Sequence, residues 1–353
     1  MVNARLILEN GMVFEGTSFG AATGRSGEVV FNTGMVGYPE SLTDPSYEGQ
    51  IIVLTYPLVG NYGVPENKVT NSIAQFESEK IHARGLVVAQ YSEHYSHWNA
   101  AQSLGEWLKK ENIPAITGID TRKLTKILRE KGTMLGKIIF DSDINMDDPN
   151  KIDIVRDVTV KERIIYNEKS NTKRVILIDC GVKHNIIRNF LKRDVTLIRV
   201  PYDYDFFNET FDAVFISNGP GDPKMCTKTI EHVKMALEKN IPTFGICLGS
   251  QIMALAAGGN TYKLKYGHRS QNQPCMLHGT KRCFITSQNH GFAVDMKTMP
   301  DGWEEWFVNV NDNTNEGIKH KTKPFLAVQF HPESSPGPND AEFLFDEFLE
   351  LLK

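Results

Sequence analysis

The sequence predicts an α/β protein with a C-terminal doubly wound, mostly parallel sheet and an N-terminal β-rich α/β domain. Three observations lead to this prediction. Beyond about residue 174, apolar β-branched runs alternate with amphipathic segments of helical period. Before residue 150 the apolar runs are short and are separated by loops rich in Gly, Pro and Asn. The chain has 353 residues, room for two or three domains of about 100 to 200 residues each.

The N-terminal domain, residues 1–150, begins with a predicted hairpin. Residues 5–9 and 12–15 are short β-rich runs joined by Asn10 and Gly11, which together are a strong signal for a tight turn. Strand-like and helical patterns continue through the domain. The remaining elements expected here are strands at 27–31, 51–55 and 85–89 and a helix capped by Thr121.

A polar, irregular stretch at residues 151–173 predicts a linker, and residues 174–353 form the second predicted domain. In this domain strands alternate with helices. The strands are expected at 175–179, 195–200, 213–217, 242–246 and 325–330, and the helices at 185–192, 227–239, 248–257 and 340–352. Ligands of such sheets bind beyond the carboxyl ends of the strands, so the residues that follow each strand are candidates for function.

Charge and cysteine content exclude several classes of function. The net charge of -4, from 39 Lys+Arg against 43 Asp+Glu, does not predict binding to nucleic acid or to an anionic membrane. Five cysteines without a C-x-x-C pair predict neither a disulfide framework nor a zinc site. No apolar run approaches the roughly 18 residues of a membrane span, and the first residues do not resemble a signal peptide. We therefore expect a cytoplasmic protein.

The strongest candidate for a reactive group is Cys247. It lies between Gly245 and Gly249, where a predicted strand meets a predicted helix, and this is the form of a nucleophile elbow. The glycines permit a tight turn, and aligned N–H groups at a helix N-terminus favour a thiolate. Cys180 also follows a strand and is a competing nucleophile, but no glycine precedes it.

A thiol nucleophile that works on an amide needs a base, and the base needs a third group to orient it. His331 ends a predicted strand and so should lie at the same edge as Cys247. Glu333, two residues later, is placed to fix the tautomer of the imidazole and to stabilise the imidazolium. His290 is the alternative base.

The loop at residues 217–223 also follows a strand and is rich in glycine and proline. The N–H groups of Gly219 and Leu248 are candidates for an oxyanion hole, whereas Pro220 has no N–H to donate. The loop fits neither phosphate-binding glycine motif, so nucleotide binding is not predicted. Glu93, with two histidines close behind it, suggests a metal, but no third ligand is evident and no metal site is predicted.

At this point the sequence resembles a family. The motifs G-I-C-L-G-x-Q, S-N-G-P-G-D-P, S-Q-N-H-G-F and F-H-P-E resemble those of class I, triad-type glutamine amidotransferases, whose sheet is flavodoxin-like. Residues 27–34, 37–40, 42–47 and 118–122 resemble the small subunit of carbamoyl-phosphate synthetase. The likeness is strongest to the glutaminase region of eukaryotic multifunctional pyrimidine-pathway proteins and their urea-cycle relatives, in which this region is fused to the synthetase. We therefore expect the present chain to be a separate subunit or an excised domain.

The resemblance implies the substrate and the role of each motif. Cys247 would attack the carboxamide of L-glutamine, with His331 and Glu333 completing the triad, and a γ-glutamyl thioester would form. Gly219 and Leu248 would supply the oxyanion hole. The family's glutamine-binding positions fall on Ser46, Gly219, Gly221, Leu248, Gln251, Asn289, Gly291 and Phe292. Ser46 lies in the N-terminal half of the chain, so this carry-over places the pocket near the domain boundary.

The family also implies a partner. Ammonia would pass to a carbamoyl-phosphate synthetase large subunit or synthetase domain, contacted mainly through the N-terminal domain. ATP, Mg and bicarbonate are expected only at that partner, and this chain is expected to hold no cofactor or metal of its own. Ser250 departs from the histidine common at this position in relatives, which puts glutamine affinity and coupling to the partner in question. A non-catalytic scaffold subunit and a stand-alone γ-glutamyl hydrolase are the competing hypotheses.

Overall fold

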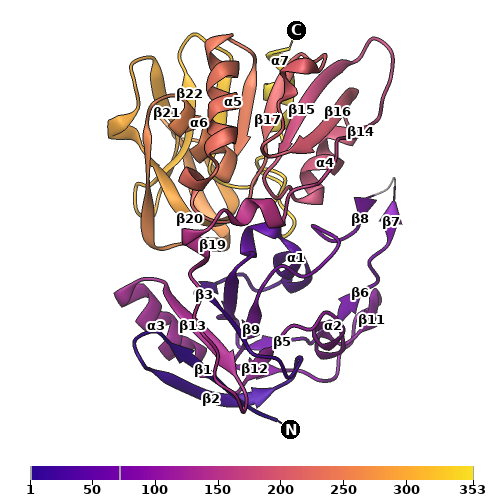
Figure 1. The fold of residues 1–353 in the computed structure, drawn as a ribbon, viewed down its shortest axis with the longest axis vertical. Helices are drawn as coiled ribbons and strands as arrows, with labels where there is room; N and C mark the ends of the chain where they lie inside the picture. The colour runs from indigo at the N-terminus through magenta and orange to yellow at the C-terminus, as the bar shows by residue number, and fades with distance from the viewer. Residues whose placement is uncertain (1, 71–72, 353) are drawn as a thin grey trace. The chain divides into compact units, whose positions relative to one another are not determined.

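The computed structural model describes residues 2–70 and 73–352. By its internal contacts the chain divides into two compact units, Met1–Ile152 and Asp153–Lys353. Each unit has a sheet and a buried core of its own, and each is described by itself below (Figure 1).

The first unit is built around a closed barrel. Among the described residues its strand order is β1, β13, β3, β4, β9, β12 and β2. Their bounds are β1 (Asn3–Leu8), β2 (Val13–Ser18), β3 (Arg25–Asn32), β4 (Gln50–Leu54), β9 (Gly85–Val87), β12 (Ala115–Thr117) and β13 (Met134–Ile139). Apolar residues such as Val30, Ile52 and Leu86 are fully buried and form the core. The predicted β-rich character of this unit follows from these short β-branched runs.

Short elements complete the first unit. They are the helices α1 (Tyr38–Thr43), α2 (Leu104–Lys110) and α3 (Thr121–Lys131), and the strands β5 (Leu58–Val59), β6 (Val64–Pro65), β7 (Val69–Thr70), β8 (Ile73–Ala74), β10 (Gln90–Tyr91) and β11 (Ala100–Gln102). The predicted first hairpin is present, with Gly11 at φ 83° in its loop. The cap of α3 is Asp120 rather than Thr121, because the Asp120 carboxylate accepts the N–H of Lys123 at 2.8 Å.

The second unit contains one large mixed sheet. Its order in the described chain is β14, β16, β15, β17, β18, β23, β22, β21, β19 and β20. The bounds are β14 (Ile164–Tyr166), β15 (Lys173–Asp179), β16 (Val195–Pro201), β17 (Ala213–Ile216), β18 (Thr243–Ile246), β19 (Asn260–Leu277), β20 (Cys283–Asp295), β21 (Trp303–Asn309), β22 (Asn315–His320) and β23 (Phe325–Val328). The five adjacent strands β16, β15, β17, β18 and β23 are parallel to one another, which confirms the predicted doubly wound core.

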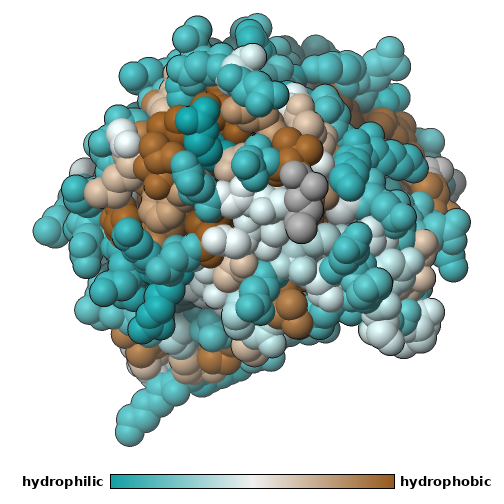
Figure 2. Space-filling view, turned by 90° about the horizontal axis from the view of Figure 1, so that it is seen from below, coloured by the Kyte–Doolittle hydropathy of each residue, from teal (hydrophilic) through white to brown (hydrophobic). Residues whose placement is uncertain are grey.

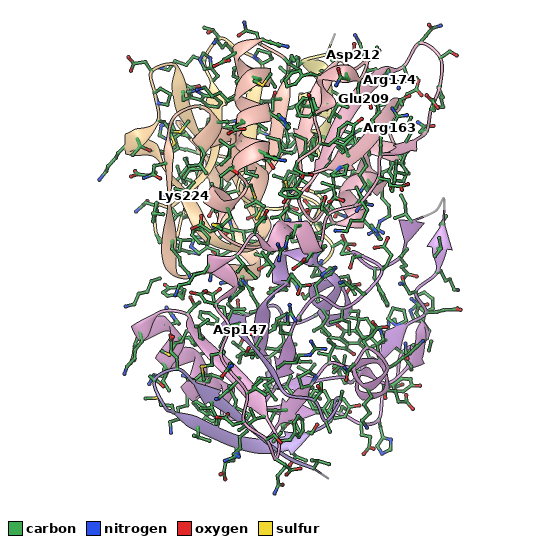
Figure 3. All side chains as sticks on the ribbon, in the orientation of Figure 1. Asp147, Arg163, Arg174, Glu209, Asp212 and Lys224 are labelled. Atoms are coloured by element: carbon green, nitrogen blue, oxygen red, sulfur yellow. The ribbon has the colours of Figure 1, made fainter. Side chains whose placement is uncertain are left out.

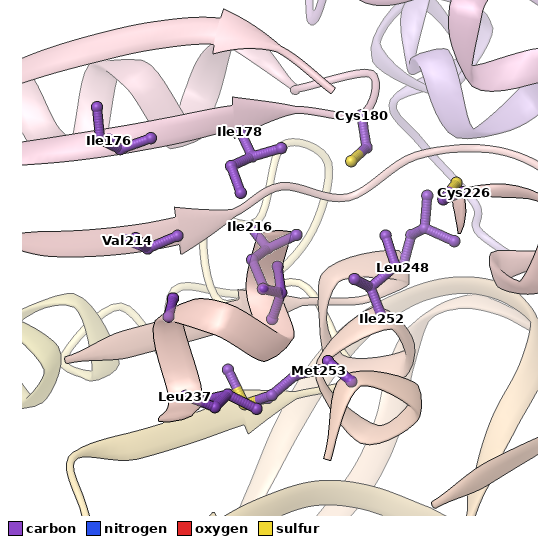
Figure 4. Packing of buried hydrophobic residues seen from close by; sticks show 14 of the residues in the cluster. Ile176, Ile178, Cys180, Val214, Ile216, Cys226, Leu237, Leu248, Ile252 and Met253 are labelled. Carbon is purple, nitrogen blue, oxygen red and sulfur yellow. The ribbon is translucent and has the colours of Figure 1, made fainter. Parts of the chain in front are cut away.

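Helices cover both faces of this parallel core. They are α4 (His184–Leu191), α5 (Thr227–Glu238), α6 (Leu248–Ala256) and α7 (Leu344–Glu350). Ile216 points to the face covered by α5 and α6, where Figure 4 shows it near Ile252 and Leu248. The neighbouring Phe215 points the other way and packs against Phe190 of α4 and Phe345 of α7. This alternation explains the continuous apolar runs of the predicted strands, since both faces are buried.

The antiparallel half of the sheet was not predicted from the sequence. Strands β19 to β22 extend the parallel core, and β22 pairs antiparallel with β23. The sequence of β19 has polar residues at most positions, for example in Lys263–Lys265 and Ser270–Gln273, so no apolar alternation announces it. Its length instead comes from pairing with β20 along most of its course.

The stretch predicted to be a linker, residues 151–173, folds largely with the second unit. Its strand β14 pairs with β16, and the Val160 N–H donates to Asp179 Oδ2 at 2.9 Å. Arg163 forms an ion pair with Glu209 at 2.6 Å, and both side chains are labelled in Figure 3. The unit boundary therefore lies between Ile152 and Asp153, because this polar segment satisfies its hydrogen bonds against the sheet instead of in water.

Candidate active site

Three neighbouring parallel strands bring three of the predicted motifs to one edge. In β17, β18 and β23 the residues Ile216, Gly245 and Ala327 stand side by side in register. The loop with Gly219 therefore begins beside Cys247 and beside the segment that leads to His331. The fourth motif joins them through β20, because the His331 N–H donates to the Ser287 carbonyl at 2.9 Å.

The turn at Cys247 has the strained geometry of a nucleophile elbow. Cys247 has φ 53° and ψ -106°, a conformation that residues with a side chain rarely adopt. A Cβ on Gly245 would stand 2.5 Å from the Gly249 carbonyl oxygen, and one on Gly249 would stand 2.2 Å from that of Ile216. Both flanking glycines are therefore required for the close approach of strand and helix, as predicted.

The Cys247 side chain is buried and points toward β20. It is 2% exposed, and its Sγ lies 3.7 Å from the Asn289 carbonyl oxygen. Its backbone N–H donates to Val328 at 2.9 Å, which ties the elbow to the neighbouring strand β23. The helix α6 begins at Leu248, so the thiol lies at the end of the helix where N–H groups are free to stabilise negative charge.

His331 and Glu333 form a buried pair next to this thiol. Their Nδ1 and Oε1 atoms are 2.6 Å apart. Burial by itself lowers the pKa of His331, but the Glu333 carboxylate and the Cys247 thiol outweigh it and raise the pKa to about 10. Nε2 of His331 is buried and has no hydrogen-bond partner among the described residues. The imidazolium is thus favoured, with its second nitrogen available for chemistry.

Lys183 is a member of this site that the sequence analysis missed. Its Nζ lies 3.0 Å from Glu333 Oε1 and also donates to the Ser334 carbonyl, and the side chain is 2% exposed. Burial raises the pKa of Glu333, but Lys183 first and His331 second outweigh it and lower the pKa to about 2. Lys183 follows β15 by a few residues. Functional residues of such sheets commonly follow parallel strands, so its position in the sequence was a usable signal.

Gly219 and Leu248, the candidates for an oxyanion hole, lie next to each other. A Cβ on Gly219 would stand 2.1 Å from the Cys180 carbonyl oxygen and 2.8 Å from Leu248 Cδ2. No side chain fits at this position, which explains the glycine. Gly221 has φ +84°, which also favours glycine. The oxyanion role of both N–H groups stays a prediction.

Gln251, a candidate glutamine-binding residue of the second unit, is hydrogen-bonded to β20 and to Gln329. Its Nε2 donates to the Phe292 carbonyl at 2.9 Å and to Gln329 Oε1 at 3.0 Å. Asn289, Gly291 and Phe292 belong to β20, whose Asn289 carbonyl faces the thiol. The Oγ of the neighbouring Ser250 is buried without a hydrogen-bond partner in the described residues.

Ser46 is the candidate substrate residue from the first unit. It belongs to a 3-10 turn, Pro45–Tyr47, and is 5% exposed. The Asp44 carboxylate accepts the Ser46 N–H at 2.9 Å, which is a common turn arrangement. Its approach to the glutamine pocket stays a prediction.

The two competing candidates for nucleophile and base are less suitable. Burial raises the pKa of the Cys180 thiol well above its ordinary value, so the thiolate is disfavoured. His290 uses both ring nitrogens, Nδ1 with the Phe292 carbonyl at 2.8 Å and Nε2 with Gln288 Oε1 at 3.2 Å. The geometry therefore favours Cys247 and His331.

One group of side chains in the described chain has the spacing of metal ligands. His268, His290 and Glu316 place their ligand atoms within 4.8 Å of one another, and all three are buried. No local sequence pattern predicts this group, because its members come from three different strands. The Glu93 segment, considered there instead, is not part of it.

Comparison with known proteins gives a family match for each unit. Residues 176–351 match the family "Glutamine amidotransferase class-I", and residues 6–138 match "Carbamoyl-phosphate synthase small chain, CPSase domain". The "Multifunctional protein CAD" of Squalus acanthias is 53% identical over 99% of this chain, which spans 16% of that protein. The "Multifunctional protein URA2" of Saccharomyces cerevisiae is 48% identical over 99% of this chain, which spans 17% of it.

A shorter relative is matched over most of its own length. The "Carbamoyl phosphate synthase arginine-specific small chain" of Aspergillus oryzae is 48% identical over 99% of this chain and 80% of the relative. The fold and the cysteine elbow define the second unit as a class I glutamine amidotransferase domain. The chain as a whole belongs to the carbamoyl-phosphate synthase small chain family. In the described residues no helix is both long enough and apolar enough to cross a membrane.

Proposed function

We propose that this chain is the glutaminase component of a glutamine-dependent carbamoyl-phosphate synthetase. It hydrolyses L-glutamine to glutamate and ammonia and passes the ammonia to a synthetase partner. The observation that carries this proposal is the arrangement of Cys247, His331 and Glu333 at one sheet edge in a chain of this family. A scaffold subunit without activity would not need a strained elbow and a buried ion pair beside it.

The first half of the reaction forms a thioester. Cys247, as a thiolate paired with the His331 imidazolium, attacks the carboxamide carbon of glutamine. The carbonyl oxygen becomes an oxyanion and accepts the N–H groups of Gly219 and Leu248. His331 donates its Nε2 proton to the amide nitrogen, the C–N bond breaks and ammonia leaves. Because Lys183 and His331 both lower the pKa of Glu333, this carboxylate stays ionised and keeps the imidazole oriented.

The second half releases glutamate. Neutral His331 accepts a proton from water, and the resulting hydroxide attacks the γ-glutamyl carbon. The C–S bond breaks, the thiolate is restored and His331 again carries two protons. No metal ion or cofactor of this chain takes part in either half.

The residues proposed to bind glutamine are Ser46, Gly219, Gly221, Leu248, Gln251, Asn289, Gly291 and Phe292. In support, the Asn289 carbonyl and the Gln251 side chain already lie on the side of the elbow that faces β20.

The partner is proposed to be a synthetase large subunit or domain that binds ATP, Mg and bicarbonate. The multifunctional relatives support this, since this chain spans only a small part of their length. The first unit exposes apolar side chains that a partner would cover, among them Met35 at 68% and Trp98 at 89%. Figure 2 shows hydrophobic residues among hydrophilic ones on the face of the molecule that is seen from below. A cytoplasmic location is proposed as well, in keeping with five free thiols.

The experiment is an assay of glutamate and ammonia release from glutamine by the purified chain, with and without a synthetase partner. The Cys247→Ala variant should lose at least about a thousandfold in rate, since the covalent step is removed. Cys283→Ala is the matched control, because this thiol is exposed and is not one of the candidate site residues, and it should keep the full rate. A wild-type chain that binds the partner and releases nothing would contradict the proposal and favour the scaffold hypothesis.

A further inference from the structure

A cluster of buried titratable side chains lies on the antiparallel strands of the second unit. It consists of His268 on β19, His290 on β20 and Glu316 on β22. His268 and His290 are direct neighbours across their strands, with ring centroids 4.9 Å apart and planes at 87°. Glu316 Oε1 lies 3.0 Å from His268 Nδ1 and 3.7 Å from His290 Nε2. Burying three titratable groups costs free energy, so the cluster calls for an explanation.

The geometry of this cluster disfavours a bound metal ion. Asn309 Nδ2 donates to Glu316 Oε1 at 3.3 Å and lies 3.5 Å from His268 Nδ1. The orientation of this amide is fixed, because the Asn311 backbone N–H donates to Asn309 Oδ1 at 2.9 Å. An NH₂ group aimed at the centre would repel a metal ion. The centre of the cluster is therefore a carboxylate that accepts hydrogen bonds from His268 Nδ1 and Asn309 Nδ2.

The charges agree with this interpretation. Burial lowers the pKa of His268, but hydrogen bonds to Asp312 and Glu316 outweigh it and raise the pKa to about 9. His268 is thus an imidazolium held between two carboxylates, with Nε2 at 2.8 Å from Asp312. Burial raises the pKa of Glu316, but His290 and His268 lower it by more. Glu316 therefore stays ionised although it is fully buried.

Two connections run from the cluster to the candidate active site, and both end on Gln251. His290 Nδ1 donates at 2.8 Å to the Phe292 carbonyl, which also accepts the Gln251 Nε2 at 2.9 Å. On the other side, the Glu316 carbonyl accepts the Gln329 N–H at 2.9 Å, and Gln329 Oε1 accepts Gln251 Nε2 at 3.0 Å. Gln251 belongs to the helix that begins at the elbow, so a shift of the cluster would move the groups around the thiol.

We propose that Glu316, held by His268, is a positioning residue that fixes Gln251 and the segment 289–292 relative to Cys247. This inference rests on the proposed glutaminase function. Glu316 acts through His290, Gln329 and the strand backbone, and it does not touch the substrate. Its effect should appear in glutamine binding, because these segments carry the candidate glutamine-binding residues.

The test compares Glu316→Gln with wild type in complex with the synthetase partner. Gln has nearly the same shape but no charge, so the His268 imidazolium loses a counter-charge and the strands shift. We expect the KM for glutamine to rise about tenfold or more while kcat changes less than about threefold. Synthesis driven by added ammonia should not change. Glu304→Gln is the matched control on the neighbouring strand, since Glu304 forms only a half-exposed pair with Lys319 at 3.1 Å.

A second variant tests the inference in case Glu316→Gln does not fold. Asp312→Asn removes the more exposed partner of His268 and should raise the KM in the same direction by a smaller factor. The inference is overturned if both variants fold and keep the wild-type KM, or if purified wild-type protein retains one equivalent of a divalent metal that Glu316→Gln lacks. If the wild-type protein itself releases no glutamate, the proposed function is overturned. That outcome is distinct from an unchanged KM in the variants, which overturns only the role of Glu316.

Discussion

The two halves of the sheet in the second unit place functional groups by different means. In the parallel half, β17, β18 and β23 end in register, and glycine-tight backbone turns carry Cys247 and Gly219 to one edge. In the antiparallel half, buried side chains of β19, β20 and β22 meet at Glu316. Tight backbone turns thus position Cys247 and Gly219, whereas the candidate glutamine-binding segment of β20 lies beside paired buried side chains from other strands.

The largest loss of folding stability is expected from replacing Lys183, which forms an ion pair with the triad residue Glu333. Lys183→Met leaves Glu333 with one counter-charge fewer in a fully buried place and should destabilise folding by about 3 kcal/mol or more. The folded pKa of Glu333, about 2, lies below its ordinary 4.5. The stability linked to this carboxylate is therefore full above about pH 4.5 and is lost as the pH falls toward 2.

Urea unfolding of Lys183→Met and wild type at pH 7 and pH 3 would check this. The gap between the two proteins should narrow at pH 3. A difference in unfolding free energy of the same size at both pH values would show that Lys183 acts by packing alone. The charge of Lys183 would then not contribute to the stability of the parallel half.

A somewhat smaller effect is expected from Gly249→Ala, which tests the backbone side of the comparison. The added methyl group would stand 2.2 Å from the Ile216 carbonyl oxygen, so strand and helix must separate. We expect a loss of about 2 to 3 kcal/mol in folding free energy together with a lower kcat.

The matched control for this variant is Gly279→Ala. Gly279 has φ +74° but nothing within 4 Å of the added methyl, so only the conformational cost of about 1 kcal/mol remains. Thermal unfolding of both variants and the kcat of each would separate the two causes. Equal losses of stability with unchanged kcat would mean that the elbow tolerates a wider turn.

The smallest effect concerns the pH dependence of the antiparallel half. The folded pKa of His268, about 9, lies above its ordinary 6.5, so its contribution to stability is full below about pH 6.5 and is lost as pH rises through about 9. Asp312→Asn removes part of this contribution. The wild type should unfold a few degrees above Asp312→Asn at pH 6, roughly as expected for about 1 kcal/mol.

Thermal unfolding of both proteins from pH 6 to pH 10 would measure this difference. It should shrink toward zero above pH 9, where His268 is neutral in both. A difference that grows with pH would contradict an imidazolium at this position and would weaken the contrast between the two halves of the sheet.

Much of the parallel half could be predicted from the sequence because its signals are local. The strand before Cys247 and the helix after it have the expected apolar patterns, and the two flanking glycines are within two residues of the thiol. His331 and Glu333 are likewise two residues apart, so their pairing needs only the strand end that precedes them. A sheet with parallel strands then brings such strand ends together without further information.

The sequence by itself thus determined the nucleophile elbow, the histidine–carboxylate pair and the parallel core. Only the tertiary structure decided that residues 153–173 fold with the second unit, that Lys183 reaches Glu333, and that His268, His290 and Glu316 meet. The physical reason is the range of the interactions. Backbone turns and strand patterns are fixed by neighbours in the chain, whereas buried charges are stable only where partners distant in the sequence are brought together and water is excluded.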